Sequence, residues 1–209
     1  MGNGFDNLGT IENSGTLIYG SYSYNSSVFL NGAIVNSGII IGGWEAGSFS
    51  ITGNLSGAGD FQEHVTFAGD VQIGDTTNRV AGISANDGYL TFASDARLFM
   101  DIASINSFDR VWANEIVLDG QLTITLLDLY MPDVGDILKL FRAESFSGDF
   151  SSINFLGLGN LGFETEWVFE ENQQAWSYQL SIVEPVPEPP TVVLFLISLL
   201  ALRAGVRKL

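Results

Sequence analysis

The chain has 209 residues, 46% of them hydrophobic, and a formal net charge of −16 at pH 7. The apolar content argues against a disordered chain, and the acidity argues against nucleic acid and anionic membrane surfaces as partners. The absence of cysteine excludes disulfides and thiolate metal sites.

The acidic charge belongs to the first 190 residues. All 24 Asp and Glu lie there with only five bases, which gives this part a net charge of −19. The five bases are Arg79, Arg97, Arg110, Lys139 and Arg142. The last 19 residues hold three bases and no acid. The C-terminal end therefore has a chemistry of its own.

The first sixty residues contain a repeat. Residues 7–18 align with residues 30–41 at an offset of 23, and a looser third copy with a shifted register spans residues 51–61. Four pairs of positions are identical: Ile11 and Ile34, Asn13 and Asn36, Ser14 and Ser37, and Gly15 and Gly38. Self-similarity at a fixed period near twenty residues is typical of a solenoid.

The residue types of this repeat favour a parallel β-helix, that is, a β-solenoid. Short apolar runs such as residues 39–41 predict strands, and Asn-Ser-Gly supplies corner residues that tolerate left-handed backbone angles. Stacking would place Ile over Ile inside and Asn over Asn at the corners. An antiparallel sandwich with Asn-Gly hairpins would show a similar alternation and remains the alternative.

Further short strands are predicted beyond the repeat, at irregular spacing. They cover residues 65–67, 71–73, 89–92, 97–100, 115–118 and 121–125, followed by a denser block at 130–143, 146–153, 167–169 and 178–182. Asn-Asp-Gly at residues 86–88 and Asp-Gly at 119–120 are turn signals. No segment keeps a 3.6-residue apolar period, so we expect an all-β fold with little helix.

The denser block carries Pro132, Gly135-Asp136 and Ser147-Gly-Asp-Phe150, then a Trp and a closing strand. It resembles the block that ends many autotransporter-like and matrix-associated β-helix passengers. This resemblance implies a folding cap without a catalytic centre. We therefore expect a solenoid over residues 1–121 and a C-terminal β cap over residues 122–183.

The C-terminal end combines a proline-rich linker, an apolar segment and a basic end. Residues 184–190 hold four prolines and include the tripeptide Pro187-Glu188-Pro189. The apolar segment, expected to be a short hydrophobic helix, comprises Thr191, Val192, Val193, Leu194, Phe195, Leu196, Ile197, Ser198, Leu199, Leu200, Ala201 and Leu202. Extended to Val206 it would be roughly 24 Å long, short of a comfortable membrane span. Arg203, Arg207 and Lys208 follow it.

These three features, in this order over residues 187–209, resemble the PEP-CTERM sorting signal of Gram-negative bacteria. The resemblance implies recognition by an exosortase, cleavage near the Pro-Glu-Pro tripeptide, and transient anchoring in the inner membrane. It also implies export to the cell surface or extracellular matrix of an exopolysaccharide-producing, biofilm-forming host. A buried core helix is a poorer account, because the segment is apolar all round and follows a proline linker.

Such a protein should carry a secretory signal, yet residues 1–7 show neither a basic region nor an apolar one. We therefore expect the solenoid to be N-terminally incomplete.

Candidate sites elsewhere are sparse. His64, the single histidine, is interpreted as a surface residue. Asp60, Asp70, Asp75 and Asp87 are interpreted as solvated carboxylates, with a Ca²⁺ site or a glycoside-cleaving pair as the alternative. Trp44, Trp112, Trp167 and Trp176 favour core or cap packing over stacking on sugars. The sequons at Asn25 and Asn54 carry little weight in a bacterium.

The leading hypothesis is a non-enzymatic structural or adhesive protein of the extracellular matrix. We expect no catalytic residue, no metal and no cofactor, and exosortase, the inner membrane and exopolysaccharide as partners. The alternative is a polysaccharide lyase or glycoside hydrolase on the same scaffold.

Overall fold

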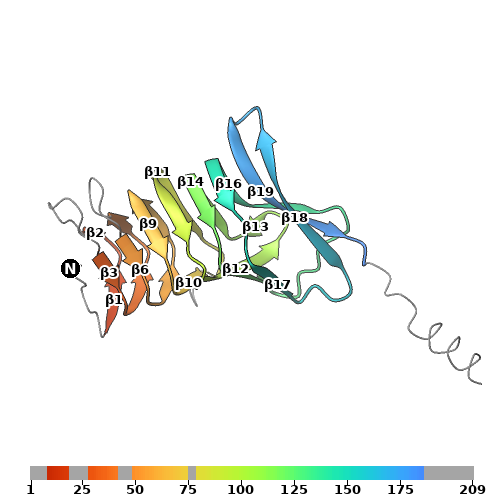
Figure 1. Ribbon diagram of the computed structural model, residues 1–209. Helices are drawn as coiled ribbons and strands as arrows, with labels where there is room; N and C mark the ends of the chain where they lie inside the picture. The colour runs from red at the N-terminus through yellow and green to blue at the C-terminus, as the bar shows by residue number, and fades with distance from the viewer. Residues whose placement is uncertain (1–8, 19–27, 42–48, 75–78, 186–209) are drawn as a thin grey trace, which may run out of the picture.

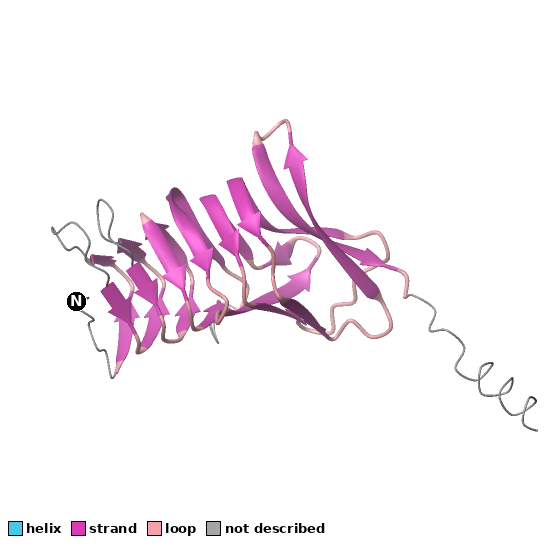
Figure 2. Cartoon of the chain, viewed as in Figure 1, coloured by secondary structure: helices cyan, strands magenta, loops and turns pink. Residues whose placement is uncertain are grey.

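The structure is a computed structural model that describes residues 9–18, 28–41, 49–74 and 79–185. Within these ranges all of the regular secondary structure is β-strand (Figure 2). The strands lie side by side along an elongated body, and the β18–β19 pair lies at the end far from the N-terminus (Figure 1). The expected all-β class is confirmed for this part of the chain.

The first sheet is built from parallel pairs. Its path, in spatial order, is β1 (Thr10–Asn13), β4 (Ala33–Asn36), β7 (Leu55–Gly57), β10 (Asp70–Ile73), β12 (Arg97–Ser104), β15 (Gln121–Leu126) and β17 (Ser152–Leu156). The short strand β13 (Ser107–Phe108) pairs antiparallel with β12. Parallel pairing thus continues well past the repeat.

The second sheet is parallel up to its last two strands. Its path is β2 (Thr16–Ile18), β5 (Ile39–Ile41), β8 (Gly59–Gln62), β11 (Gly82–Phe92), β14 (Arg110–Leu118), β16 (Ile137–Gly148), β19 (Ala175–Val183) and β18 (Gly162–Glu170). The pairs β16–β19 and β18–β19 are antiparallel. This sheet therefore ends in an antiparallel hairpin.

A third row of short parallel strands joins the second sheet through β11. The row consists of β3 (Val28–Leu30), β6 (Phe49–Ile51) and β9 (His64–Phe67). The first half of β11 pairs with β8 and its second half with β9, with a register irregularity between Ala85 and Tyr89. The long strand β11 thus pairs with both short strands, β8 and β9.

The 23-residue repeat has the predicted register. Ile11 lies beside Ile34 and Asn13 beside Asn36 in the β1–β4 pair. In the next pair Ile34 lies beside Leu55, so the third copy follows at an offset of 21, a value that was not predicted from the sequence. Parallel pairing throughout the repeat departs from the antiparallel sandwich alternative.

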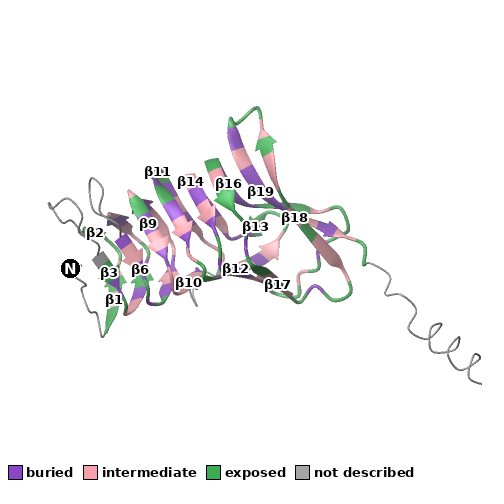
Figure 3. Ribbon diagram, in the orientation of Figure 1, coloured by how far each residue is buried: buried purple, intermediate pink, exposed green. Residues whose placement is uncertain are grey.

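The core is the space that the strands enclose. Along many strands, such as β12 and β14, buried residues alternate with more exposed ones, and the ribbon coloured by burial shows this banding (Figure 3). Aromatic rings run through this core: the centroids of Phe67 and Phe92 are 5.2 Å apart in a stacked pair, and those of Phe141 and Tyr178 are 5.5 Å apart edge to face. Aromatic pairs in these geometries stabilise a core beyond their buried area.

The expected C-terminal hydrophobic helix lies outside the described residues. No helix in the described ranges meets the length and apolarity needed to cross a membrane.

Candidate functional site

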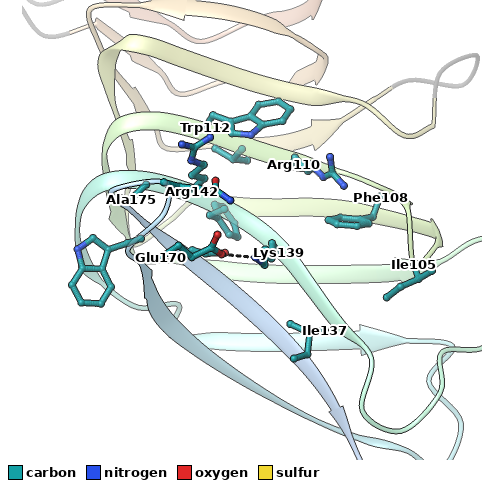
Figure 4. A pocket seen from close by; sticks show the side chains of 14 residues that line it. Ile105, Phe108, Arg110, Trp112, Ile137, Lys139, Arg142, Glu170 and Ala175 are labelled. Atoms are coloured by element: carbon teal, nitrogen blue, oxygen red, sulfur yellow. Dashed lines mark ion pairs between the residues drawn. The ribbon is translucent and has the colours of Figure 1, made fainter.

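A surface hollow lies on the outer face of the second sheet, over β14 and β16 and beside the β18–β19 hairpin (Figure 4). On β14, Val111 and Ala113 face the core, so Arg110 and Trp112 face outward. This alternation is the ordinary two-residue period of a strand.

An irregularity in β16 determines which of its side chains face the hollow. Leu140 and Phe141 are both buried, and the register with β19 shifts between Lys139 and Phe141. Two consecutive inward residues reverse the alternation, as a bulge does. Lys139 and Arg142 therefore both face outward, and Arg142 lies beside Trp112 on the neighbouring strand.

The groove consists of two adjoining hollows of about 350 and 210 Å³. Trp112, Arg142, Gln173 and Ala175 line both. The first hollow continues toward the β13 turn and the second toward β11. We call the pair the basic groove, with Trp112 and Arg142 at its middle.

The charges of the two hollows differ. Arg110, Lys139, Arg142 and Glu170 line the first hollow. The Lys139 Nζ is 2.6 Å from the Glu170 Oε1, so these two charges neutralise each other (Figure 4). The Arg110 guanidinium lies 4.3 Å from the centre of the Phe108 ring, a cation–π contact that keeps its charge available. Arg142 and Glu144 both line the second hollow, so their charges balance there.

The indole of Trp112 lies against a glycine of the neighbouring strand. A Cβ placed on Gly82, in the neighbouring strand β11, would lie 2.5 Å from the Trp112 Cζ3. The ring therefore occupies the space that a side chain at this position would need. Half-buried against the strand, Trp112 presents its remaining surface to the groove.

The first hollow also contains a buried hydroxyl. Ser177 on β19 is 3% exposed, and its Oγ has no hydrogen-bond partner in the described part of the chain. A buried hydroxyl without a partner is unfavourable by about 1–3 kcal/mol. Because this oxygen is enclosed, Ser177 belongs to the wall of the hollow rather than to its open surface.

Asp109, a carboxyl with a raised pKa, lies outside the groove and has a structural role. Asp109 is fully buried, and its two oxygens accept hydrogen bonds of 2.7 Å from the backbone N–H groups of Ala81 and Asp101. Burial raises the pKa of this carboxyl to about 7, against the effect of those two hydrogen bonds. A group with both oxygens bonded to backbone and no exposure cannot contact a substrate.

All members of the predicted sorting signal lie outside the described residues. These are Pro187, Glu188 and Pro189, the segment 191–202, and Arg203, Arg207 and Lys208. Their role stays a prediction. Trp44 and Asp75 also lie outside this range, as does the side chain of Asp87.

The remaining predicted candidates do not come together. His64 is exposed, as interpreted, and its Nε2 is 3.2 Å from the Thr91 hydroxyl. Asp60 lies in the second sheet and accepts a 2.9 Å hydrogen bond from the Ser84 hydroxyl. Asp70 lies in the first sheet, 2.6 Å from the Arg97 Nε. Within the described ranges no three His, Asp or Glu gather as a metal site would require.

The tryptophans divide into two groups. Trp167 and Trp176 pack on Phe146, with ring centroids 4.1 and 5.0 Å apart, in an aromatic cluster of the terminal hairpin. This is the packing role expected of them. Trp112 instead lines the groove.

In the sequence Arg110, Lys139 and Arg142 counted only as charges, and their convergence was not predicted. One signal was available: three of the five bases in the acidic part fall between residues 110 and 142. Arg110 and Trp112 also sit two residues apart in a strand pattern, which places them on one face.

No protein-family model matches the chain, and no curated protein matches it.

Proposed function

We propose that this chain is an exported structural or adhesive protein of the bacterial surface or extracellular matrix, built as a β-solenoid. The observation that carries the proposal is the parallel register of the 23-residue repeat, in which Asn13 lies beside Asn36. A stack of this kind grows by adding like units, and its long side offers an extended surface for contact.

The solenoid is supported by two sheets whose strands alternate along the chain. The chain passes from β4 in one sheet to β5 in the other, then from β7 to β8, with each strand parallel to its predecessor in the stack. The antiparallel hairpin β18–β19 supports a cap at the C-terminal end. A cap is needed because an unpaired last strand would invite aggregation.

The C-terminal end, in this proposal, is a PEP-CTERM sorting signal. Residues 191–202 form a short hydrophobic helix that holds the protein at the inner membrane. Exosortase then cleaves near Pro187-Glu188-Pro189 and releases the body to the surface. The support is the order of tripeptide, apolar segment and basic end in the sequence.

The arrangement of carboxylates in the basic groove favours binding over catalysis. Hydrolysis of a glycosidic bond ordinarily needs two carboxyl groups flanking the bond. In the described part of the chain each hollow is lined by one, Glu170 or Glu144, and Glu170 is paired with Lys139. We therefore place a polysaccharide lyase or hydrolase second.

The test is to express the chain behind an export signal in an exosortase-containing Gram-negative host and to measure the intact mass of the surface product. We expect a product that ends near residues 187–189. The variant Glu188→Ala should retain the tail and stay with the membrane. Glu184→Ala removes the same charge from the same linker and should be processed normally.

A surface product that still carries residues 191–209, or a chain that never leaves the cytosol, would contradict this proposal. Release of reducing sugar from an exopolysaccharide, abolished by Glu170→Gln or Glu144→Gln, would support the enzymatic alternative instead.

A further inference from the structure

We propose that the basic groove binds an acidic oligosaccharide, with a carboxylate-bearing sugar in the first hollow and a neutral sugar in the second. This inference rests on the proposed adhesive function, because it names the ligand class that such a protein would contact. It commits to a glycan carboxylate rather than to a free anion or an acidic peptide.

The first argument is charge. The first 190 residues carry a net charge of −19 with only five bases, yet three of the five line a single hollow. Lys139 is neutralised by Glu170, which leaves the guanidinium groups of Arg110 and Arg142 for a ligand. Among the described residues Arg142 has no carboxylate partner. A guanidinium binds a carboxylate with two parallel hydrogen bonds, which makes it the preferred partner for such a group.

The second argument is the flat apolar surface beside these cations. Trp112 lies next to Arg142 across the β14–β16 pair, and its ring lies against Gly82, where the missing side chain leaves room for it. A sugar ring has an apolar face of C–H groups that packs on an indole, while its hydroxyls and carboxylate reach polar groups at the edge. An acidic peptide offers no comparable flat face.

The third argument is the polar lining of the second hollow. Four amide side chains line it: Asn86, Asn114, Gln173 and Gln174. An amide both donates and accepts hydrogen bonds, as a sugar hydroxyl does. Because the Glu144 carboxylate lines this hollow and would repel a second carboxylate, the hollow suits an uncharged sugar, and the sugar carboxylate belongs in the first hollow.

The experiment is isothermal titration calorimetry of the full chain with an aldobiouronic acid, in which one glucuronic acid is linked to one neutral sugar, at moderate salt and neutral pH. Its fully methyl-esterified form is the neutral match, and inorganic phosphate and triglutamate are the anions without a sugar ring. We expect the acid to bind, and the ester, phosphate and triglutamate to bind about tenfold more weakly or not at all.

Two groove variants test the placement. Arg142→Gln and Trp112→Ala should each weaken binding of the acid by about tenfold or more, through the lost charge-assisted hydrogen bonds and the lost stacking surface. Arg97→Gln is the matched control, because it removes the same charge from the other sheet. It should leave the affinity unchanged. A thermal melt of each variant establishes that it is folded.

The proposal is overturned if the aldobiouronic acid does not bind, if its ester binds equally well, or if phosphate or triglutamate binds as tightly. It is also overturned if both folded groove variants keep the wild-type affinity, or if self-association of the chain occupies the groove and Arg142→Gln abolishes it. None of these outcomes depends on C-terminal processing. The failure of this inference and the failure of the sorting proposal are therefore distinguishable.

Discussion

The side-chain amide of Asn13 donates a 2.7 Å hydrogen bond to the Oδ1 of Asn36, its counterpart one repeat later. Asn36 in turn donates from its own Nδ2 to the Ala58 carbonyl at 2.7 Å. Asn36 is 1% exposed, so these bonds form inside the stack. A column of amides thus links three successive units at one corner.

Replacing Asn36 should disrupt this column. Asn36→Ala removes the donor to the Ala58 carbonyl and the acceptor for Asn13, and leaves both groups poorly solvated. We expect a loss of about 1–3 kcal/mol in the free energy of unfolding, measured by urea denaturation. Asn154→Ala, on the exterior of β17, should cost much less. Equal losses for the two variants would contradict a structural role for the column.

Gly38 should be intolerant of a side chain. A Cβ at this position would lie 2.1 Å from the Gly15 carbonyl oxygen, a backbone atom that cannot move aside cheaply. We expect Gly38→Ala to destabilise the protein by about 1–3 kcal/mol or more, measured by thermal or urea unfolding. Gly15→Ala is the natural control, because a Cβ there meets nothing within 4 Å. If Gly38→Ala proved as stable as Gly15→Ala, the close stacking at this corner would be wrong.

Asp109 should make stability depend on pH. Its pKa is raised from 3.8 to about 7 by burial, so between these values the folded state holds a proton that the unfolded state has lost. Its stabilising contribution is therefore complete below about pH 4 and falls as pH rises toward 7, by up to about 1.4 kcal/mol per pH unit. Burial also raises the pKa of Asp101, with Arg79 opposing, and acts in the same direction.

The measurement is the urea midpoint between pH 4.5 and 7.5 for the wild type and two variants. Asp109→Asn should flatten the pH dependence, but it should also lower the stability, because its NH₂ group would face a backbone N–H donor. Asp95→Asn, at an exposed position, should keep the wild-type dependence. A wild-type slope that survives in Asp109→Asn would assign the pH effect to other groups.

The aromatic core should be sensitive to the loss of one ring. Phe92 is fully buried and its ring lies 5.2 Å from Phe67, centroid to centroid. We expect Phe92→Ala to cost about 3–5 kcal/mol, measured by urea unfolding, because it opens a cavity that rigid sheets cannot close. Phe169→Ala, at a ring that is 43% exposed, should cost distinctly less. If the two variants lost a similar free energy of unfolding, the stacked aromatic rings of the core would contribute no special stability.

The sequence alone determined the class of fold and the register of the first repeat. Ile11 and Ile34, and Asn13 and Asn36, could be paired in advance because identical residues recur at a fixed offset, and like units in a stack occupy like positions. That the third copy shifts its register was also readable, since it too depends on local pattern, but the offset of 21 was not.

Only the tertiary structure decided the basic groove. Arg110 and Arg142 are 32 positions apart in the chain, and no pattern connects them. They share a face because β14 and β16 pair in parallel and because two consecutive inward residues, Leu140 and Phe141, turn Arg142 outward. The adjacent apolar pair is visible in the sequence, but whether both residues turn inward depends on how the strand meets its neighbours. Local periodicity fixes which face a side chain takes within one strand, whereas the convergence of distant side chains is set by how the strands pack.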